Sequence, residues 1–593
     1  MCGPFCSVPA VPTITEVVPP AMRSRASAHV SSSMKTVSDA LPDDMVAGAS
    51  AGRWADTVTA KTNRDAKIEW VARFFMAVDY NKPMRLISSV ILAFVVAGCA
   101  SGGAAPTRTQ PAPMPTEAAS PLRQRWLEMF ARGYFPGRSG QIFLVPREGD
   151  FITEHDPLYL FMHGSPWEYD TRIPLLFHGA PFVKPGQWKD AAAQQDIAPT
   201  IGALIGAPEP ATYTGHPLAN ALTTAAGRPR VVSLIVLDAM RADYFDKHAD
   251  FMPTLSRMRR EGSWFGEART TVLPTVTGVG HATIGTGADP RFHGITVNNL
   301  FNRATGKMQP AYNNLDPQEL MALTLGDSWN LATNGAAVII GQGGAIRATA
   351  GLVGRGSCLI GAKKVTAASY GGADGGWETN PTCYTMPEAL KPFVGRKVWE
   401  AAGGTHMGHD ISSASKFRAS SLYQKFEAEA LMAVVNASAA GADDITDLIF
   451  VNMKGPDYAA HMHGPDSAEL RDTLAELDRQ MTRYLALVEK KAGPGRSLTV
   501  VTADHGTPGD PQPWRRHYTD ELETLINKRF DPEGKVVQYY GDAANSQMFL
   551  DTARLQSRGF TLKDVAAMLE GLDFLDAAFT EDEVRAAQAR LRK

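Results

Sequence analysis

The stretch "RVVSLIVLDAMRADYF", residues 230–245, indicates the fold class of this chain. Its apolar residues follow one another without the alternation of a strand that has one face in water, so we expect a strand buried on both faces. Strands of that kind belong to parallel sheets that have helices on both sides. The strand ends at a carboxylate, Asp238. The stretch therefore predicts an α/β fold with a polar group at the carboxyl end of a central strand.

Other stretches repeat this shape. "DLIFVNMKGPD" (447–457) and "SLTVVTADHG" (497–506) are also apolar runs that end in acidic residues, and "PLLFHG" (174–179) is a further buried run. Because ligands bind outside the carboxyl ends of the strands in an open α/β sheet, we expect the acidic residues to meet at one edge. We predict a central, mostly parallel sheet flanked by helices, with a Gly-rich inserted cap at about residues 300–420.

Carboxylates and histidines occur together near these strand ends. Asp457 and His461 are four residues apart, so one helical turn would place both on the same side. A histidine in the turn "HGSP" precedes the 174–179 run. Aspartate and histidine in these numbers suit two zinc-like ions. The candidate ligands are Asp238, Asp457, His461, Asp504, His505 and His163.

The stretch "TTVLPTVTGVGHATIGTGADPRFHGITVNN" (270–299) has hydroxyls and glycines where a backbone must approach a ligand closely. Here the sequence resembles the alkaline phosphatase superfamily, in its branch with a threonine nucleophile. That branch contains phosphate-irrepressible alkaline phosphatases and nucleotide pyrophosphatase/phosphodiesterases. "DYAAHMHGPDS" and "TADHG" match further motifs of the superfamily, and the resemblance covers most of residues 122–550.

The resemblance implies a site and a mechanism. Thr277 would attack phosphorus and form a phosphothreonine intermediate, and Asn298 would donate to a nonbridging phosphoryl oxygen. Two zinc ions would hold the attacking and leaving oxygens, because metal coordination makes a threonine hydroxyl a competent nucleophile. The ion that activates the nucleophile would be bound by Thr277, Asp238, Asp504 and His505. The ion that stabilises the leaving oxygen would be bound by Asp457, His461 and His163.

The order of the motifs differs from that of the family. In the family, the motif that contains "HGSP" follows the "ADHG" motif, whereas here it precedes the nucleophile. Residues 121–141 and the final segment 579–593 resemble adjacent pieces of one family segment. We therefore expect a circularly permuted domain in which His163 supplies the last metal ligand, which folds tolerate when the original termini lie close together. The alternative makes His517 the ligand and residues 122–225 a separate module.

Substrate class is left open by the sequence. Monoesterases of this branch resemble one another in a Lys-x-Arg pair that meets the extra phosphate charge; here Arg355 fits the Arg, and Val353 stands in place of the Lys. Other cations that could serve are Arg347, Lys363 and Lys364. The diesterases use a hydrophobic surface instead, for which Phe301, Trp377 and Tyr384 are available. We expect hydrolysis of phosphate monoesters or diesters; the alternatives are a nucleotide pyrophosphatase/phosphodiesterase-type diesterase and a non-catalytic metal-binding lipoprotein.

The N-terminal part indicates export. "MRLISSVILAFVVAGC" (84–99) has a positive charge, a short apolar run and small residues before Cys99, as in a bacterial lipoprotein signal peptide. We expect a lipid on Cys99, a tether at 100–120, a catalytic domain at 121–593, and a periplasmic enzyme anchored to the outer membrane. Residues 1–83 would be disordered or a start-site artefact. The same compartment permits a disulfide between Cys358 and Cys383, with two free thiols as the alternative.

Charge and size set the expected partners. The formal net charge of -3 gives no basic footprint, so nucleic acid is not an expected partner. The expected partners are a small phosphoester and, through the lipid, a membrane. The 593 residues suffice for a large core with an insertion, and the oligomeric state is not predicted.

Overall fold

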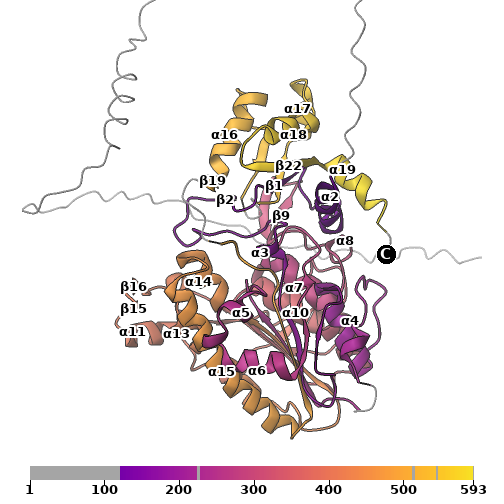
Figure 1. The fold of residues 1–593 in the computed structure, drawn as a ribbon, viewed down its shortest axis with the longest axis vertical. Helices are drawn as coiled ribbons and strands as arrows, with labels where there is room; N and C mark the ends of the chain where they lie inside the picture. Colours follow the sequence, from indigo (N-terminus) through magenta and orange to yellow (C-terminus); the bar gives the residue numbers. More distant parts are fainter. Residues whose placement is uncertain (1–119, 224–226, 510–514, 542–544, 592–593) are drawn as a thin grey trace, which may run out of the picture. The chain divides into compact units, whose positions relative to one another are not determined.

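A ten-stranded mixed sheet forms the centre of the computed structural model, which describes residues 120–223, 227–509, 515–541 and 545–591 (Figure 1). The expected signal peptide, Cys99, the tether and residues 1–83 lie outside the described residues. Four neighbouring strands run parallel, and every residue of three of them, β6, β11 and β17, is buried. In spatial order these four are β11 (Ile339–Gly343), β17 (Asp447–Met453), β6 (Val231–Leu237) and β18 (Ser497–Thr502).

Antiparallel strands complete the sheet at both ends. β3 (Leu175–His178) pairs antiparallel with β18, and β7 (Ser263–Phe265) pairs antiparallel with β3. At the other end β12 (Val365–Gly371) continues the parallel order and β13 (Gly376–Glu378) reverses it. The fold is therefore α/β with a mixed central sheet. The two short strands at the sheet's margins are β4 (Gly186–Trp188) and β14 (Tyr384–Thr385).

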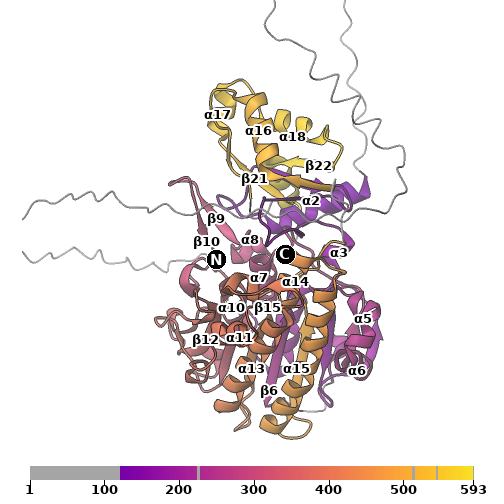
Figure 2. The ribbon, with the colours of Figure 1, turned by 90° about the vertical axis from the view of Figure 1, so that its left-hand side faces the viewer.

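Helices cover both faces of this sheet (Figures 1 and 2). On one face α13 (Ser421–Ala437) packs against α15 (Ala468–Ala492), whose leucine stripe is buried. On the other face lie α7 (Thr277–Thr286), α10 (Ile346–Val353) and α4 (Ile197–Ile205). The apolar run of each strand and the apolar side of each helix share one large core. Among the described residues, no helix is both long and apolar enough to cross a membrane.

The segment expected to be a cap contains strands of the central sheet. β11, β12 and β13 all lie within residues 300–420. The sequence analysis did not predict these strands, because a Gly-rich composition is more typical of loops than of strands. In β11 the glycine allows close packing of α10: a Cβ at Gly343 would lie 2.7 Å from the Thr349 hydroxyl. Two small hairpins stand outside the sheet: β9 (Asn299–Asn302) with β10 (Lys307–Pro310), and β15 (Thr405–His406) with β16 (His409–Asp410). The structure has a disulfide between Cys358 and Cys383.

A second, four-stranded antiparallel sheet joins the two ends of the described chain. The early strand β1 (Ile142–Pro146) lies between β21 (Gln547–Leu550) and β22 (Leu575–Thr580), and β20 (Val537–Tyr539) forms the outer edge. The side-chain amide of Gln588 donates to the carbonyl of Tyr134 (2.7 Å), so the final helix lies beside the first. The expected adjacency of residues 121–141 and the C-terminal segment is thus present. The helices here are α2 (Pro121–Gly133), α16 (Thr519–Phe530), α17 (Thr552–Ser557), α18 (Leu562–Glu570) and α19 (Glu581–Gln588).

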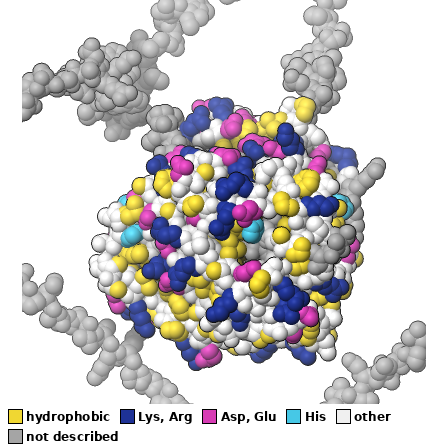
Figure 3. Space-filling model, turned by 60° about the horizontal axis from the view of Figure 1, so that its bottom comes forward, with side chains coloured by type: hydrophobic (Ala, Val, Ile, Leu, Met, Phe, Trp, Pro, Cys, Tyr) yellow, Lys and Arg dark blue, Asp and Glu magenta, His cyan; other side chains and the backbone are white. Residues whose placement is uncertain are grey.

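On the molecular face in Figure 3, acidic and basic side chains are interspersed.

The remaining helices and strands are short. The other helices are α3 (Glu168–Thr171), α5 (Tyr244–Lys247), α6 (Pro253–Glu261), α8 (Pro290–His293), α9 (Leu325–Ala332), α11 (Gly395–Ala401), α12 (Ala414–Phe417) and α14 (Gly455–His463), and the other strands are β2 (Phe151–Thr153), β5 (Ala192–Ala193), β8 (Ala268–Arg269) and β19 (Arg516–Tyr518).

Candidate active site

The carboxyl ends of three neighbouring strands form one side of a polar site. Asp238 directly follows β6, and Asp504 and His505 follow β18. After β17 the chain turns into α14, which carries Asp457 and His461 on one side. Because Leu237 pairs with Met453 and Val236 pairs with Thr502, the three strands end at the same edge. All of these side chains are buried.

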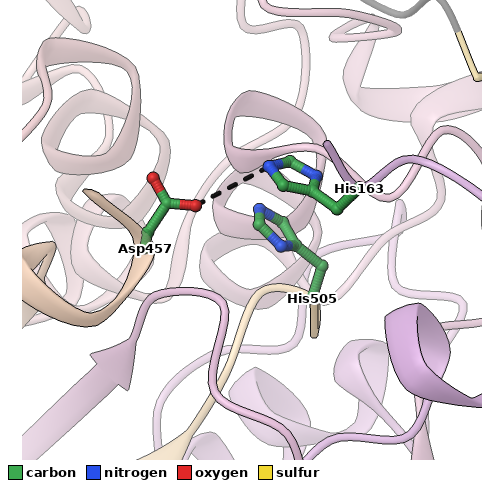
Figure 4. Close-up of side chains that lie close together, drawn as sticks. All are labelled: His163, Asp457 and His505. Atoms are coloured by element: carbon green, nitrogen blue, oxygen red, sulfur yellow. Dashed lines mark ion pairs between the residues drawn. The ribbon is translucent and has the colours of Figure 1, made fainter. Parts of the chain in front are cut away.

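His163 reaches this edge from the loop before α3. Its Nε2 lies 3.6 Å from Asp457 Oδ1, and its ring stacks on that of His505 at 3.7 Å between centroids (Figure 4). Its Nδ1 donates to the carbonyl of Thr275 (2.7 Å), which leaves Nε2 facing the aspartate. Burial and the neighbouring His505 lower the pKa of His163, and the neutral ring is the form that binds metals. His517, by contrast, pairs with Asp150 at 3.2 Å and stacks on Phe574.

Several of the converging atoms lack hydrogen-bond partners. Among the described residues, Asp457 Oδ1, Asp504 Oδ2 and His505 Nε2 are buried and make no hydrogen bond. His461 donates from Nδ1 to the carbonyl of Phe161, and its Nε2 lies 3.3 Å from Asp457 Oδ1. A buried polar atom without a partner costs about 1–3 kcal/mol, so this convergence is typical of a site that holds a cation. Carboxylate oxygen and imidazole nitrogen fit zinc among other divalent ions.

The ligand atoms cluster in two groups. Those of His163, Asp457 and His505 lie within 4.8 Å of one another, and so do those of Asp238, His281 and Asp504. The first group includes His505, which the resemblance assigns to the ion that would activate the nucleophile, whereas His163 and Asp457 are assigned to the other ion. His281 donates from Nδ1 to the carbonyl of Thr277 (2.9 Å), and its Nε2 accepts from the amide of Asn452 (3.0 Å). Both of its nitrogens are therefore engaged within the protein, as expected for a structural histidine.

Thr277 is the first residue of α7 and is 1% exposed. Partial positive charge at a helix N-terminus favours an anionic group placed there. Asn298 accepts a hydrogen bond from the backbone N–H of Gly278 (2.8 Å) and so is held beside Thr277. The structure thus brings the expected nucleophile, the expected oxyanion donor and the expected metal ligands together.

Lys454 is a site residue that the sequence analysis missed. Its Nζ lies 2.7 Å from Asp238 Oδ1, 2.6 Å from Asp457 Oδ2 and 2.9 Å from the Thr277 hydroxyl. The side chain has no exposed surface. Burial opposes its charge, but the carboxylates of Asp238 and Asp457 raise the pKa of Lys454 above its usual value. The only signal in the sequence was a lysine three residues before Asp457, in "NMKGPD".

A cavity of about 480 Å³ opens onto these groups. Its lining includes Thr277, Asn298, His163 and His461. Its walls carry two arginines and several tyrosines: Arg347, Arg418, Tyr159, Tyr312, Tyr370 and Tyr458. A cavity lined by a hydroxyl at a helix N-terminus and by cations is suited to an anionic ester.

Comparisons with known proteins identify the family. A family model described as "Type I phosphodiesterase / nucleotide pyrophosphatase" matches residues 232–573, more than half of the chain. The chain belongs to the type I phosphodiesterase/nucleotide pyrophosphatase family. The expected alkaline phosphatase superfamily, in its threonine-nucleophile branch, and the expected enzyme class, a phosphoric ester hydrolase, are thereby confirmed.

Relatives within and near this phosphodiesterase family are distant. Alkaline phosphatase PafA of Elizabethkingia meningoseptica is 25% identical over 407 residues, which cover 58% of this chain and 73% of PafA. A protein named calcium-transporting ATPase from Myroides odoratus is 25% identical over 431 residues, which cover 61% of this chain and 77% of that protein. The crystal structure of PafA has a TM-score of 0.47 and 22% identity, covering 58% of this chain and 76% of PafA.

The structure differs from the sequence-based expectation for Arg355. In this family member the guanidinium of Arg355 donates to the carbonyl of Leu320 (3.0 Å), and its backbone N–H donates to Asp327 (2.7 Å). Arg355 does not line the cavity; Arg347, at the start of α10, does. Counting positions along the chain could not show that Arg347, on α10, lines the cavity and that Arg355, beyond the end of α10, does not.

The aromatic residues named for a diester surface lie elsewhere. Phe301 packs on Phe549, Trp377 stacks on Phe426, and the Tyr384 hydroxyl donates to the carbonyl of Gly354 (2.6 Å). None of the three lines the cavity, whose aromatic wall is made of tyrosines.

His293, in the short helix α8 that follows α7, makes stability depend on pH. Its Nδ1 accepts from the backbone N–H of Ile295 (3.1 Å), and its Nε2 donates to Thr283 (3.1 Å). Burial, with the charge of Arg138, lowers the pKa of His293 to about 3. Between that value and the unfolded value near 6.5, only the unfolded chain binds the proton, so stability is lost as the pH falls.

We expect His293→Asn to weaken this dependence. Below pH 6.5, wild type should lose about 1 kcal/mol per pH unit more than the variant, because the variant has no imidazole to protonate on unfolding. Urea unfolding at pH 7.5 and pH 5, with divalent ions removed from both proteins, measures the difference. Equal losses in the two proteins would contradict the assignment.

Proposed function

We propose that this chain is a metal-dependent phosphoesterase that transfers a phosphoryl group to Thr277 and then to water. The observation that supports it most is the position of the Thr277 hydroxyl, at the N-terminus of α7 and in the lining of the cavity, beside the converging carboxylates and imidazoles. Phosphoryl transfer requires positioning and charge stabilisation more than covalent chemistry, and this site offers both.

The chain's own residues define the steps of this proposal. Thr277 Oγ1 forms the bond to phosphorus as the ester oxygen leaves with a proton, which yields an alcohol and a phosphothreonine. Water then breaks the phosphothreonine bond, and phosphate is released. The amide of Asn298 would donate to a nonbridging oxygen, and the Nζ of Lys454 donates to the threonine hydroxyl (2.9 Å).

Metal content is the second part of the proposal. When bound, a divalent ion would lower the pKa of the threonine hydroxyl and stabilise charge on the reacting oxygens. The buried atoms without hydrogen bonds fit such an ion, and the resemblance indicates zinc. Two ions, as in the resemblance, also require Asp238 and Thr277 as ligands, and both are held by Lys454.

For the substrate we propose a phosphate monoester, with a diester as the second candidate. Arg347 and Arg418 on the cavity wall support a dianionic group, since each charge-assisted hydrogen bond contributes about 1.5–3 kcal/mol. The tyrosine wall is the observation that favours a diester, because it could contact a second ester group. Hydrolysis of p-nitrophenyl phosphate against bis-p-nitrophenyl phosphate decides between them. Turnover of neither, with metal bound, would support the non-catalytic lipoprotein.

Arg347→Ala is expected to lower kcat/KM for p-nitrophenyl phosphate by roughly 10- to 100-fold, the equivalent of one charge-assisted contact. The loss for the diester should be smaller, because a diester carries less charge. Arg355→Ala is the matched control, since Arg355 is engaged with Leu320 outside the cavity. A larger effect of Arg355→Ala than of Arg347→Ala would restore the sequence-based assignment.

We also propose that the domain is circularly permuted. The family model begins at residue 232, after the segment that carries His163, and β1 pairs with strands from the end of the chain. The alternative module of residues 122–225 would not need to contribute to the site. Substitution of His163 against His517, described in the Discussion, tests this proposal.

Export and anchoring form a separate proposal, on the sequence of residues 84–99 alone. The enzyme would be lipidated on Cys99 and held in the periplasm at the outer membrane. Cys99→Ala is expected to move activity from the membrane fraction to the soluble periplasmic fraction, because one covalent anchor is lost. Fractionation with antibody detection measures it; unchanged membrane association of the variant would reject lipidation at this position.

A further inference from the structure

Lys454 donates hydrogen bonds to two oxygen atoms that a second metal ion would need as ligands. The Thr277 hydroxyl and Asp238 Oδ1 both lie within hydrogen-bond distance of its Nζ. The other oxygen of Asp238 accepts from the side-chain amide of Asn452 (2.8 Å). Of the four ligands expected for the ion that activates the nucleophile, two are therefore already held by nitrogen donors.

The ligand atoms without hydrogen bonds gather around His505. Asp504 Oδ2 and His505 Nε2 lie 3.1 Å apart, and neither makes a hydrogen bond among the described residues. His505 clusters with His163 and Asp457, the ligands expected for the other ion. The ligand atoms without hydrogen bonds are thus those of Asp457, Asp504 and His505. Lys454 holds Asp238 and Thr277, and it also contacts the other oxygen of Asp457 at 2.6 Å.

We propose that Lys454 replaces one of the two metal ions, so that this site binds one divalent ion at His163, Asp457 and His505, and the Lys454 ammonium positions the Thr277 hydroxyl. His461 and Asp504 lie beside this group, 3.3 Å from Asp457 Oδ1 and 3.1 Å from His505 Nε2. The inference rests on the proposed function, because it assigns the metal content of the same site. Lys454 is a positioning residue in this account, since it bridges two carboxylates and the nucleophile.

The charges of the site agree with one ion. Three buried carboxylates, Asp238, Asp457 and Asp504, carry three negative charges, and one divalent ion with one ammonium matches them. A second divalent ion beside the lysine would leave a buried excess of positive charge, which low dielectric makes costly.

The backbone and Cβ of Lys454 are also tightly packed against neighbouring residues. Its backbone N–H donates to Glu427 (3.1 Å), and a Cβ at Gly344 would lie 2.4 Å from the Cβ of Lys454. With no exposed surface, the ammonium has no route into water that would release Asp238 and Thr277 to an ion.

Metal counting tests the inference. Full-length protein is dialysed against zinc, and unbound zinc is then removed. The number of zinc ions per chain is measured by inductively coupled plasma mass spectrometry. We expect one zinc per chain at this site in wild type and two in Lys454→Met, which keeps the volume and removes the charge. Two in wild type, or one in Lys454→Met, would overturn the inference.

A surface group must not enter the count. His409, His463 and Glu469 could hold an ion of their own. All counts are therefore made in the His409→Ala background, which removes one of these three ligands.

A second measurement uses wild-type protein alone, so it tests the inference even if Lys454→Met does not fold. Wild type loaded with Mn²⁺ should give the electron paramagnetic resonance spectrum of an isolated ion. A spectrum of two coupled ions would overturn the inference without any variant. Hydrolysis by wild type against Thr277→Ala tests the proposed function separately: absence of turnover with one isolated ion bound would reject the phosphoesterase and leave the lysine assignment intact.

Discussion

Thr277→Ala is expected to lower kcat for p-nitrophenyl phosphate by ~1,000-fold or more, because removing a nucleophile leaves only binding and charge stabilisation. Thr277 is buried at the start of α7, and no other hydroxyl is bonded to Lys454 in the described structure. The rate is measured with metal content matched between variant and wild type. More than a tenth of wild-type activity in the variant would show that another group attacks phosphorus.

Thr277→Ser is the matched control for this result. Serine keeps the hydroxyl and loses a methyl group, so we expect it to retain activity within ~10- to 100-fold of wild type. Acid quenching during turnover should leave a phosphorylated peptide that contains residue 277 in wild type and in Thr277→Ser, and none in Thr277→Ala. A phosphorylated peptide elsewhere in the chain would move the nucleophile.

His163→Ala is expected to have the second large effect. His163 Nε2 faces Asp457 Oδ1 at 3.6 Å, within the group whose atoms are buried and converge. Even outer-shell partners of a metal ligand change affinity by ~10- to 100-fold, so loss of a direct ligand should weaken zinc binding by at least ~100-fold, with a parallel loss of kcat/KM. Zinc affinity is measured by competition with a chelator.

His517→Ala is the control for His163→Ala. His517 pairs with Asp150 and stacks on Phe574, away from the metal ligands, so we expect unchanged zinc affinity and at most about 1 kcal/mol of lost stability. If His517→Ala instead released the ion and His163→Ala did not, residues 122–225 would be a separate module and the permutation would be rejected.

These contrasts show how far local sequence patterns reach. The largely apolar runs of β6 and β17 predicted buried parallel strands, because burial on both faces removes the alternation of apolar and polar positions. The acidic residues that follow these strands were expected at one sheet edge, and Asp238, Asp457 and Asp504 lie there. Gly-rich β11 escaped detection, because its glycines serve close packing with α10, which composition does not encode.

The sequence by itself determined the α/β class, and it predicted Thr277 as the candidate nucleophile and the types of candidate metal ligand, since each depends on residues close together in the chain. Tertiary structure alone decided which distant residues share the site. It placed Arg347 rather than Arg355 in the cavity wall, His163 rather than His517 beside Asp457, and Lys454 between two carboxylates. The physical reason is that side-chain direction depends on how helices pack on the sheet. From the sequence alone, a lysine three residues before an aspartate, as Lys454 is before Asp457, suggests an exposed ion pair on a helix. Only the tertiary structure shows that both side chains are buried.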